Sequence, residues 1–408
     1  MSSIQPTPLW RNRDFMLLQS GQLLSTFGSG ISGIAYPLLA LAVTHSAAKT
    51  GYVGAVEVAP VVLVSVPAGV AVDRFDRRLL MIVADVVGAA ALGVLAAAVL
   101  TGHVSFWLIL AVAFADSGAA VFYRAGNSGA LKAIVPPVQL ADASSVRMAR
   151  MSTVRLTAPP VGGALFGVLR GLPFLADAIS YVFSTVALLL TRTRFQEERE
   201  PGARVRMREG MTYFWQMPFL RVTVGMIAAS NVAAVGVPVA LIILAHRRGF
   251  SGAAIGAFIA LEGVTLLAGS LLSPFLRRVL PMRAILLSEF WTALVYAAFV
   301  VEPNVYVLVA ALAVHAFWFP NTDSAMEAYS YTLIPDRLLG RAMAASNTLR
   351  AASAPVGPLA AGLLVAHTSS RIAIVALAAP VCVAAVLGTL SPALRDLPTL
   401  GASPAAAG

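Results

Sequence analysis

Five ionisable side chains stand inside long apolar runs of this chain, where an unpaired charge is costly. Three are the carboxylates Asp116, Glu57 and Glu262, and two are the cations Arg155 and Arg350. A buried carboxylate loses its charge when it binds a proton, so it can couple proton binding to another event. Asp116 is the first candidate for this role, before Glu262 and Glu57. The alternative is a structural ion pair with Arg155 or Arg350.

The sequence offers no support for metal or phosphate chemistry. Its five histidines are scattered without metal-ligand spacing, and Cys382 is its single cysteine. Phosphate-binding loops, serine-hydrolase elbows and zinc-protease helix motifs are absent from the sequence. We therefore expect no enzymatic activity, no metal and no cofactor, with a proton gradient as the energy source.

The elements that carry these residues are predicted to be membrane helices. Of the 408 residues, 58% are hydrophobic and 12% are charged, whereas a soluble domain has about 25% charged residues. The mean hydropathy is +0.81. A helix needs about 20 apolar residues to cross the hydrocarbon core, and the runs lack the alternation of a membrane β-barrel. They predict an all-α membrane protein with twelve transmembrane helices, near residues 15–43, 51–72, 79–100, 105–124, 145–169, 172–191, 219–245, 253–276, 282–301, 305–329, 342–366 and 372–390.

A mixed-charge stretch divides the chain into two halves of six predicted helices. This stretch has the composition of a solvated linker with room for a short surface helix. The predicted organisation is an N-terminal six-helix bundle at 1–191, a cytoplasmic linker at 192–218, a C-terminal six-helix bundle at 219–391 and a short disordered cytoplasmic tail at 392–408.

The two halves resemble each other at an offset of about 200 residues. Gly69 and Arg77 fall on Gly269 and Arg277 at that offset. A near-constant offset over several regions indicates duplication of a six-helix unit. It predicts two pseudo-symmetric bundles, an arrangement that suits alternating access.

The distribution of basic residues predicts the orientation in the membrane. With the N-terminus inside, the inner segments hold 21 of the 29 Lys and Arg residues and the outer segments hold 5. Both termini are therefore predicted to be cytoplasmic, in a multi-pass protein of the cell inner (plasma) membrane. This bias also accounts for the net charge of +10 without a nucleic-acid partner. We expect the lipid bilayer and a small-molecule substrate as partners, and a monomer.

The segment 69–78 reads G-x-x-x-D-R-x-x-R-R between the second and third predicted helices. It resembles the signature loop of the major facilitator superfamily, whose usual form is G-x-x-x-D-R-x-G-R-[KR]. The variant D-R-x-D-R-R, with Asp76 in place of glycine, resembles the subgroup that contains macrolide efflux proteins and enterobactin exporters. The resemblance covers the whole chain and implies the major facilitator fold. It also implies that a gating loop is formed by Gly69, Asp73, Arg74, Arg77 and Arg78.

A second motif, A-P-P-V-G-G at 158–163, lies in the fifth predicted helix. It is similar to the end of the superfamily's antiporter motif, G-P-x-x-G-G, with Ala158 in place of the first glycine. The residues that match are Pro159, Gly162 and Gly163, and the segment 357–362 repeats the pattern in the eleventh predicted helix. In the superfamily this motif accompanies export. The alternative is ordinary close packing of helices through small residues.

Polar residues at steps of three or four along the first predicted helix share one face, which we expect to line protein or water. The resemblance implies that the first, fourth, seventh and tenth helices surround a substrate cavity. Its candidate residues are Gln22, Ser25, Ser29, Ser32, Tyr36, Asn231, His315, Phe319, Arg155 and Arg350. For His315 the alternative is a hydrogen-bonded core histidine. The subgroup often has an acid near residues 28–30, and this sequence has none there.

Three further acids are expected to lie outside the cavity. The resemblance implies that Asp85, Asp177 and Glu289 face away from the cavity, so we expect them to pair with neighbouring helices or helix ends.

These observations predict a secondary active transporter that exports amphipathic small molecules of drug or antibiotic type by proton-coupled alternating access. The alternative within transport is export of a siderophore or another anionic metabolite, which Arg155 and Arg350 would favour. The alternative of another class is a membrane scaffold or sensor that transports nothing.

Overall fold

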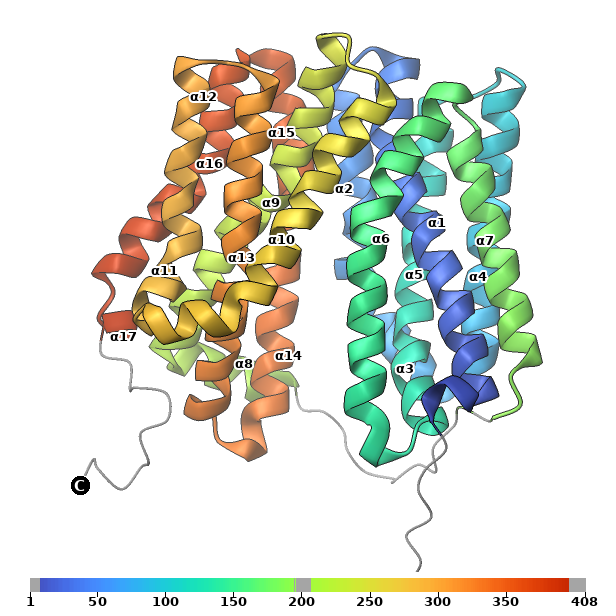
Figure 1. Ribbon diagram of the computed structural model, residues 1–408, viewed down its shortest axis with the longest axis horizontal. Helices are drawn as coiled ribbons and strands as arrows, with labels where there is room; N and C mark the ends of the chain where they lie inside the picture. The colour runs from blue at the N-terminus through green and yellow to red at the C-terminus, as the bar shows by residue number, and fades with distance from the viewer. Residues whose placement is uncertain (1–7, 194, 196–206, 396–408) are drawn as a thin grey trace, which may run out of the picture. The chain divides into compact units, whose positions relative to one another are not determined.

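The computed structural model describes residues 8–193, 195 and 207–395, in which helices are the regular elements and no strand occurs (Figure 1). The first half contains α1 (Arg13–Thr44), α2 (Ala47–Leu63), α3 (Ser65–Arg74), α4 (Arg77–Leu100), α5 (Phe106–Ile134), α6 (Leu140–Val168) and α7 (Leu172–Leu190). The second half contains α8 (Met207–Gln216), α9 (Pro218–Arg247), α10 (Gly252–Val279), α11 (Met282–Thr292), α12 (Ala298–Val301), α13 (Val305–Leu333), α14 (Asp336–Ala352), α15 (Val356–His367), α16 (Ser370–Leu390) and α17 (Pro392–Arg395). Short 3-10 turns occupy Leu9–Arg11, Pro137–Gln139 and Ala293–Ala297.

Capping side chains and prolines set the ends of several helices. Asn12, Asp76 and Ser105 cap α1, α4 and α5 by accepting hydrogen bonds from backbone N–H groups three residues later, at 3.1, 2.8 and 3.2 Å. Helices α2 and α3 meet at Val64 with a bend of 44°, and Pro67 in the first turn of α3 has no N–H group with which to continue the backbone hydrogen bonds of α2. Pro355 stands at another break, between α14 and α15.

The number of membrane spans is close to the prediction. Among the described residues, ten helical stretches are long and apolar enough to cross a membrane, and the bent pair of α2 and α3 makes an eleventh. The remaining predicted span corresponds to α6. Its 29 residues give a length of about 44 Å, but Arg147, Arg150 and Arg155 make it too polar for the apolar criterion. The all-helical membrane fold is confirmed, whereas a count of exactly twelve apolar spans is not reached.

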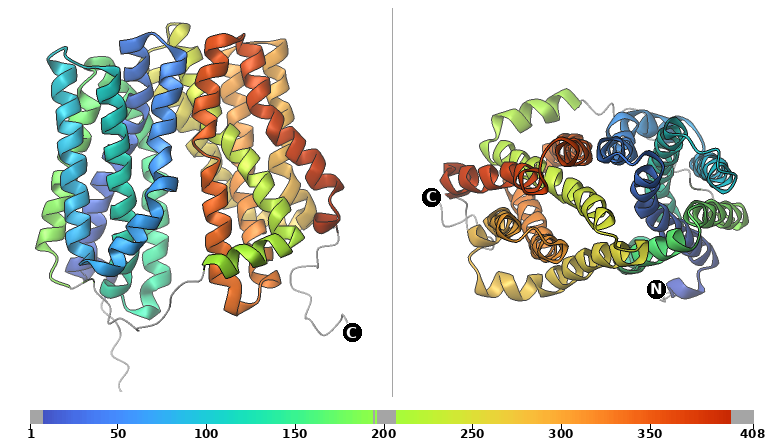
Figure 2. Two further views of the ribbon diagram at one scale, coloured as in Figure 1. Left: turned by 180° about the vertical axis from the view of Figure 1, so that it is seen from behind. Right: turned by 90° about the horizontal axis from the view of Figure 1, so that it is seen from above.

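The chain divides into two compact units, and the first comprises Met1–Pro201 with Ala245–Ala260. Within it, α1 packs against α7 and α6, and α4 packs against α5 and α7. The helices run side by side in the ribbon views (Figure 2). Glycines allow the closest approaches: a Cβ added to Gly21 would lie 3.0 Å from the Ala187 side chain, and one added to Gly162 would lie 2.6 Å from the Ile31 carbonyl oxygen.

One end of the first unit is fastened by an apolar cluster and by backbone-directed hydrogen bonds. Phe15, Met81, Ile134 and Phe195 belong to the buried cluster. Asn12 Nδ2 donates to the Ile134 carbonyl at 3.2 Å. The starts of α1 and α4 and the end of α5 therefore meet at the same end of the unit, as alternating helix directions require.

The second unit comprises Gly202–Leu244 and Leu261–Gly408. In it, α11 packs against α13 and α16. Gly236 of α9 and Gly357 of α15 touch backbone to backbone, since a Cβ added to Gly236 would lie 2.7 Å from the Gly357 carbonyl oxygen. This contact resembles the approach of α6 to α1 in the first unit, as expected for a repeated design.

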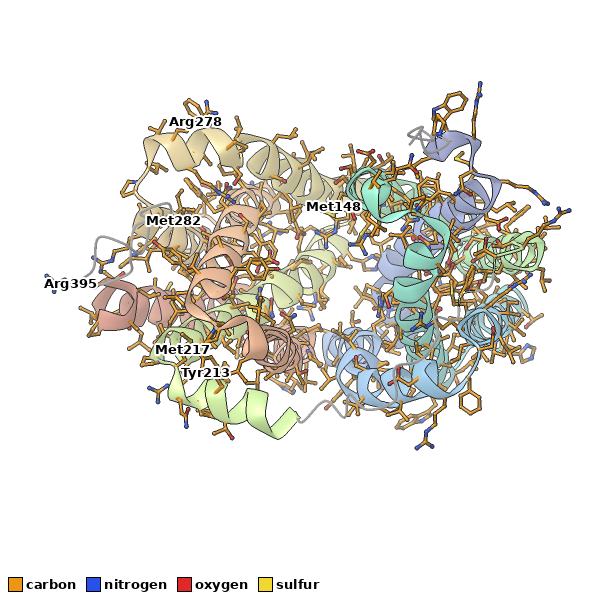
Figure 3. The ribbon with its side chains drawn as sticks, turned by 90° about the horizontal axis from the view of Figure 1, so that it is seen from below. Met148, Tyr213, Met217, Arg278, Met282 and Arg395 are labelled. Atoms are coloured by element: carbon orange, nitrogen blue, oxygen red, sulfur yellow. The ribbon has the colours of Figure 1, made fainter. Side chains whose placement is uncertain are left out.

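The predicted linker contains one short helix, α8, which packs on α14. Figure 3 shows α8 from below, with Tyr213 of α8 and Met217, which follows the helix, labelled. The predicted domain boundaries at 191, 218 and 391 stay predictions, and most of 192–206 and all of 396–408 lie outside the described residues.

Candidate functional site

The side chain of Asp116 on α5 is buried near the middle of the first unit's helices, with 6% of the residue exposed. Tyr36 of α1 donates its hydroxyl to Oδ2 at 3.1 Å, and Tyr181 of α7 donates to Oδ1 at 2.8 Å. Both carboxylate oxygens are thus held by neutral donors from two other helices. Arg155 is an exposed residue of α6, so the alternative of a structural ion pair between Asp116 and Arg155 is wrong.

Asp177 on α7 is a second buried carboxylate in the same unit. Ser32 of α1 donates to its Oδ2 at 2.5 Å, and Ser180 donates to its Oδ1 at 3.1 Å. Gly28 of α1 makes room for this group, because a Cβ there would overlap the carboxylate. The expected inter-helix pairing of Asp177 is confirmed. The space beside Gly28, where this sequence has no acid of its own, is occupied by a carboxylate from α7.

The two carboxylates are connected through α1 and α7. The Tyr181 hydroxyl, which donates to Asp116, lies 3.3 Å from Ser29 Oγ. Ser32, which donates to Asp177, also bonds the carbonyl of Ser29 at 3.2 Å. A displacement of α1 against α7 would therefore change the surroundings of both carboxylates together.

Glu57 of α2 is half-buried and faces α1, with its Oε1 3.8 Å from the position of a Cβ added to Gly33. Its carboxylate is therefore within the first unit, as are those of Asp116 and Asp177. Its part in proton coupling stays a prediction.

A cavity of about 330 Å³ opens inside the first unit, between α1, α4, α5, α6 and α7. Three of the predicted cavity residues, Gln22, Ser25 and Ser29, line it, whereas Ser32 and Tyr36 are buried against the carboxylates instead. Arg155 is not among its lining residues. The polar side chains of the lining are Gln22, Ser25, Thr26, Ser29, Asp85, Tyr123, Arg124, Asn127, Ser128, Arg147, Arg150 and Tyr181.

One wall of this cavity is an amide and guanidinium network. Arg150 of α6 donates through Nη1 to Gln19 at 2.7 Å and also to Gln22, and Gln22 donates to Asn127 of α5. The Nε atom of Arg150 is buried and has no hydrogen-bond partner among the described residues. The sequence analysis counted Arg150 among the basic residues of the inner segments, although it falls inside the helix predicted at 145–169.

Asp85 of α4 also lines the cavity, contrary to the prediction that it faces away from it. The residue is 0% exposed, and among the described residues neither carboxylate oxygen has a hydrogen-bond partner. The hydroxyl groups of Tyr123 and Ser184 instead lie 3.2 Å from each other. The expected pairing of Asp85 with a neighbouring helix therefore stays a prediction.

The second unit contains a buried carboxylate and imidazole pair. Glu289 of α11 accepts a hydrogen bond from Ser230 of α9, and its Oε1 lies 3.8 Å from His315 Nε2 on α13. Ser230 and Thr292 lie 3.4 Å from the two ring nitrogens of His315. His315 is thus a hydrogen-bonded core residue, and the expected pairing of Glu289 is confirmed.

Arg350 of α14 pairs with Asp323 of α13. Asn231 of α9 donates to the Arg350 carbonyl at 2.9 Å, so it fastens the helix that carries the ion pair. Glu262 and Phe319 are half-buried residues of α10 and α13. The roles of these residues in substrate or proton binding stay predictions.

Some residues of the signature loop are hydrogen-bonded to backbone carbonyl groups, and others are exposed. Arg77 donates to the Phe195 carbonyl at 3.1 Å, and its guanidinium fills the space over Gly129 of α5. Arg78 donates to the Leu189 carbonyl at 2.5 Å. The loop residues Gly69, Asp73 and Arg74 are exposed, and Gly69 has open space around it.

The antiporter-like motif is a close-packing surface of the first unit. The Ala158 side chain lies 2.6 Å from the position of a Cβ at Gly30, and Gly162 contacts the backbone of α1 at Ile31. Gly163 touches the backbone of Gly252, within the same unit. The packing interpretation of this motif is therefore observed; its link to export belongs to the proposed function.

The fold and the site define the class of this protein: an all-helical, multi-pass membrane protein of two repeated units with carboxylates buried at membrane depth. A family model described as transmembrane secretion effector matches residues 4–404, and the chain belongs to that family. The family is a branch of the major facilitator superfamily, so the prediction made from the signature loop is confirmed.

Two groups of relatives carry names that concern efflux. The multidrug efflux pump Tap of Mycobacterium tuberculosis is 27% identical over 405 residues, which cover 93% of this chain and 94% of that protein. Macrolide efflux protein A of Streptococcus pyogenes is 25% identical over 207 residues, which cover 50% of this chain and 51% of that protein.

Solved transporters share the fold. A bacterial homologue of the human lysosomal transporter Spinster, inward-facing and unoccupied, has a TM-score of 0.74 at 15% identity and covers 96% of this chain and 98% of its own. The nucleoside transporter NupG has a TM-score of 0.75 at 12% identity, with 93% and 99% covered. Identities this low establish the fold alone.

Proposed function

We propose that this chain exports amphipathic small molecules of drug type by secondary active transport, in exchange for protons. The efflux names of its relatives support the direction and the substrate type. One observation carries the coupling: the Asp116 carboxylate is buried at membrane depth between the hydroxyl groups of Tyr36 and Tyr181. Among the described residues its hydrogen-bond partners are neutral hydroxyl groups, so a proton bound by Asp116 would make the site neutral.

The coupling follows from the position of Asp116 between three helices. A charged carboxylate in a water-poor site carries a large desolvation free energy, and protonation removes it. Since Tyr36 belongs to α1 and Tyr181 to α7, the cost of the charge depends on how these helices pack around α5. Protonation therefore changes the balance between conformational states, and a ligand that prefers one state competes with the proton.

The membrane orientation is part of the proposal. The 21-to-5 distribution of basic residues supports cytoplasmic termini in a plasma membrane. The substrate would then enter from the cytoplasmic side or the inner leaflet, and protons would move inward down their gradient. The protein would act as a monomer, without a metal or cofactor.

The test is flux in inverted membrane vesicles with an imposed pH gradient, across cationic, neutral and anionic fluorescent probes. One proton per molecule supports about a tenfold probe ratio for each pH unit. Asp116→Asn should abolish this accumulation and leave probe exchange, because an amide can still meet both tyrosine hydroxyls but cannot release a proton. Asp116→Glu should keep partial accumulation.

The matched control is Asp142→Asn, a change at an exposed carboxylate of α6. It should behave as the unaltered protein does. If Asp116→Asn still accumulates a probe against its gradient, Asp116 is not the coupling group, and Glu262 and Glu57 are tested next. If no probe of any charge moves in response to the gradient, the proposed function itself fails.

A further inference from the structure

The cavity of the first unit presents positive charge and no accessible negative charge among its lining residues. Arg124, Arg147 and Arg150 line it, the first two as exposed side chains and the third half-buried. Asp85 is the acidic residue of the cavity wall, and its 0% exposure places its carboxylate behind the side chains that form the cavity surface. We propose that this cavity binds the acidic group of an amphipathic organic anion through these three arginines. The proposal rests on the proposed function and specifies the substrate's charge.

The depth of the arginines distinguishes them from ordinary basic residues at a membrane surface. Helices α5 and α6 each have 29 residues, so each is about 44 Å long and extends about 7 Å beyond a 30 Å hydrocarbon core at either end. Arg124 is ten residues before the end of α5, and Arg150 is ten residues after the start of α6. Both thus lie about 15 Å along their helices, deeper than the inner loops with which the count of basic residues had grouped them. Arginine is costly at that depth and marks substrate or ion paths.

Hydrogen bonds hold the Arg150 guanidinium in place, but one of its N–H groups has no acceptor among the described residues. Gln19 and Gln22 orient it, while its Nε atom is buried without a partner among the described residues. A buried N–H group without an acceptor is costly, and a carboxylate or sulfonate oxygen would satisfy it. The neighbouring methionine, Met148, is labelled in Figure 3 and marks this part of α6.

The rest of the lining suits the apolar body of such a molecule. Tyr123 and Tyr181 contribute aromatic rings, and Ala84, Ala119 and Met151 contribute aliphatic surface. A volume of about 330 Å³ is within the range of small-molecule sites. The expected ligand is a molecule with one aromatic or polycyclic body and one carboxylate or sulfonate.

The experiment measures binding of three dansyl compounds to the full chain in nanodiscs, with no gradient imposed. Dansylglycine is an anion, dansylglycinamide is its neutral amide, and N-dansylethylenediamine is a cation. The unaltered protein should bind dansylglycine about tenfold or more tightly than the amide, as expected for one charge-assisted contact. Arg150→Gln and Arg124→Gln should each remove most of that preference while affinity for the neutral amide stays the same.

Two further variants distinguish an effect of the arginine's charge from an effect of altered structure. Arg124→Lys keeps the charge on a side chain that has no hydrogen-bond or ion-pair partner among the described residues, and it should retain the preference. Arg371→Gln removes an exposed arginine of the second unit and should change nothing. A preference for the cation, or an anion preference that survives Arg124→Gln and Arg150→Gln, would overturn the assignment.

These outcomes are separate from a failure of the proposed function. If the vesicles accumulate cationic probes only, export stands and the anion site is wrong. If dansylglycine binds as expected but no probe moves with the pH gradient, the anion site stands and proton-driven export fails.

Discussion

Replacement of Gly28 by alanine tests the contact that holds the second carboxylate in place. A Cβ on Gly28 would overlap the Asp177 carboxylate and the Ser180 hydroxyl, and would lie 2.9 Å from Ser180 Cβ. Neither group is free to move aside. Ser32 holds Asp177 at 2.5 Å, and Ser180 Oγ is bonded to the Asp177 carbonyl at 2.7 Å.

The expected cost follows from these contacts. Overpacking of a closed core costs about 1–3 kcal/mol, and loss of the Ser32 hydrogen bond adds about 0.5–1.5 kcal/mol. The higher helix propensity of alanine offsets up to about 1 kcal/mol of this loss of unfolding free energy. The net loss of unfolding free energy is thus about 0.5–3.5 kcal/mol. Displacement of Asp177 from α1 should also reduce proton-driven flux, because Ser29 and Tyr181 connect this region to Asp116.

Gly93→Ala on α4 is the matched control, because a Cβ there meets nothing within 4 Å. It gains the helix propensity of alanine without steric overlap, so the two variants should differ in unfolding free energy by about 1.5–4.5 kcal/mol. The assay compares their unfolding in nanodiscs, followed by vesicle flux at equal protein content. Equal stability and equal flux of the two glycine variants would refute the tight fit of α1 against α7.

Two other predictions concern the loop and the topology. Asp73→Asn should weaken transport at normal expression, whereas Asp76→Asn should not, because asparagine can still cap α4 as Asp76 does at 2.8 Å; equal flux of Asp73→Asn and the unaltered protein at matched expression would contradict this. In intact cells, a membrane-impermeant thiol reagent should label Ala48→Cys and fail to label Ala203→Cys in a background without Cys382, and the opposite pattern would reverse the orientation.

For most residues, the position along the helix could be predicted from the sequence. The side of the helix on which a residue lies could be predicted for only some of them. The stripe from Gln22 to Tyr36 was predictable because several polar residues at steps of three or four share one face. Single polar residues carry no such signal. Asp85 was assigned to an outward face, and the structure places it on the cavity of the first unit.

Helix α6 illustrates the same limit with arginines. Arg150 and Arg155 are five residues apart, which corresponds to a rotation of about 140°. They therefore cannot face one cavity, and the structure selects Arg150. The partners of Asp116 were unpredictable for a different reason. Tyr181 reaches it from α7, and the pairing of helices far apart in sequence is set by packing of the whole unit.

The two units use their acids differently, although their helices repeat each other. In the first unit, hydroxyl groups hold Asp116 and Asp177, so proton binding to either would change the net charge of the unit's interior. In the second unit, Asp323 already has the Arg350 guanidinium as its partner, and the buried Glu289 has the Ser230 hydroxyl and lies 3.8 Å from the His315 ring. A carboxylate that is paired with a fixed cation gains less from a proton, since protonation exposes the cation's charge. Proton exchange is therefore best supported by the first unit, beside the cavity where the polar helix α6 supplies its arginines.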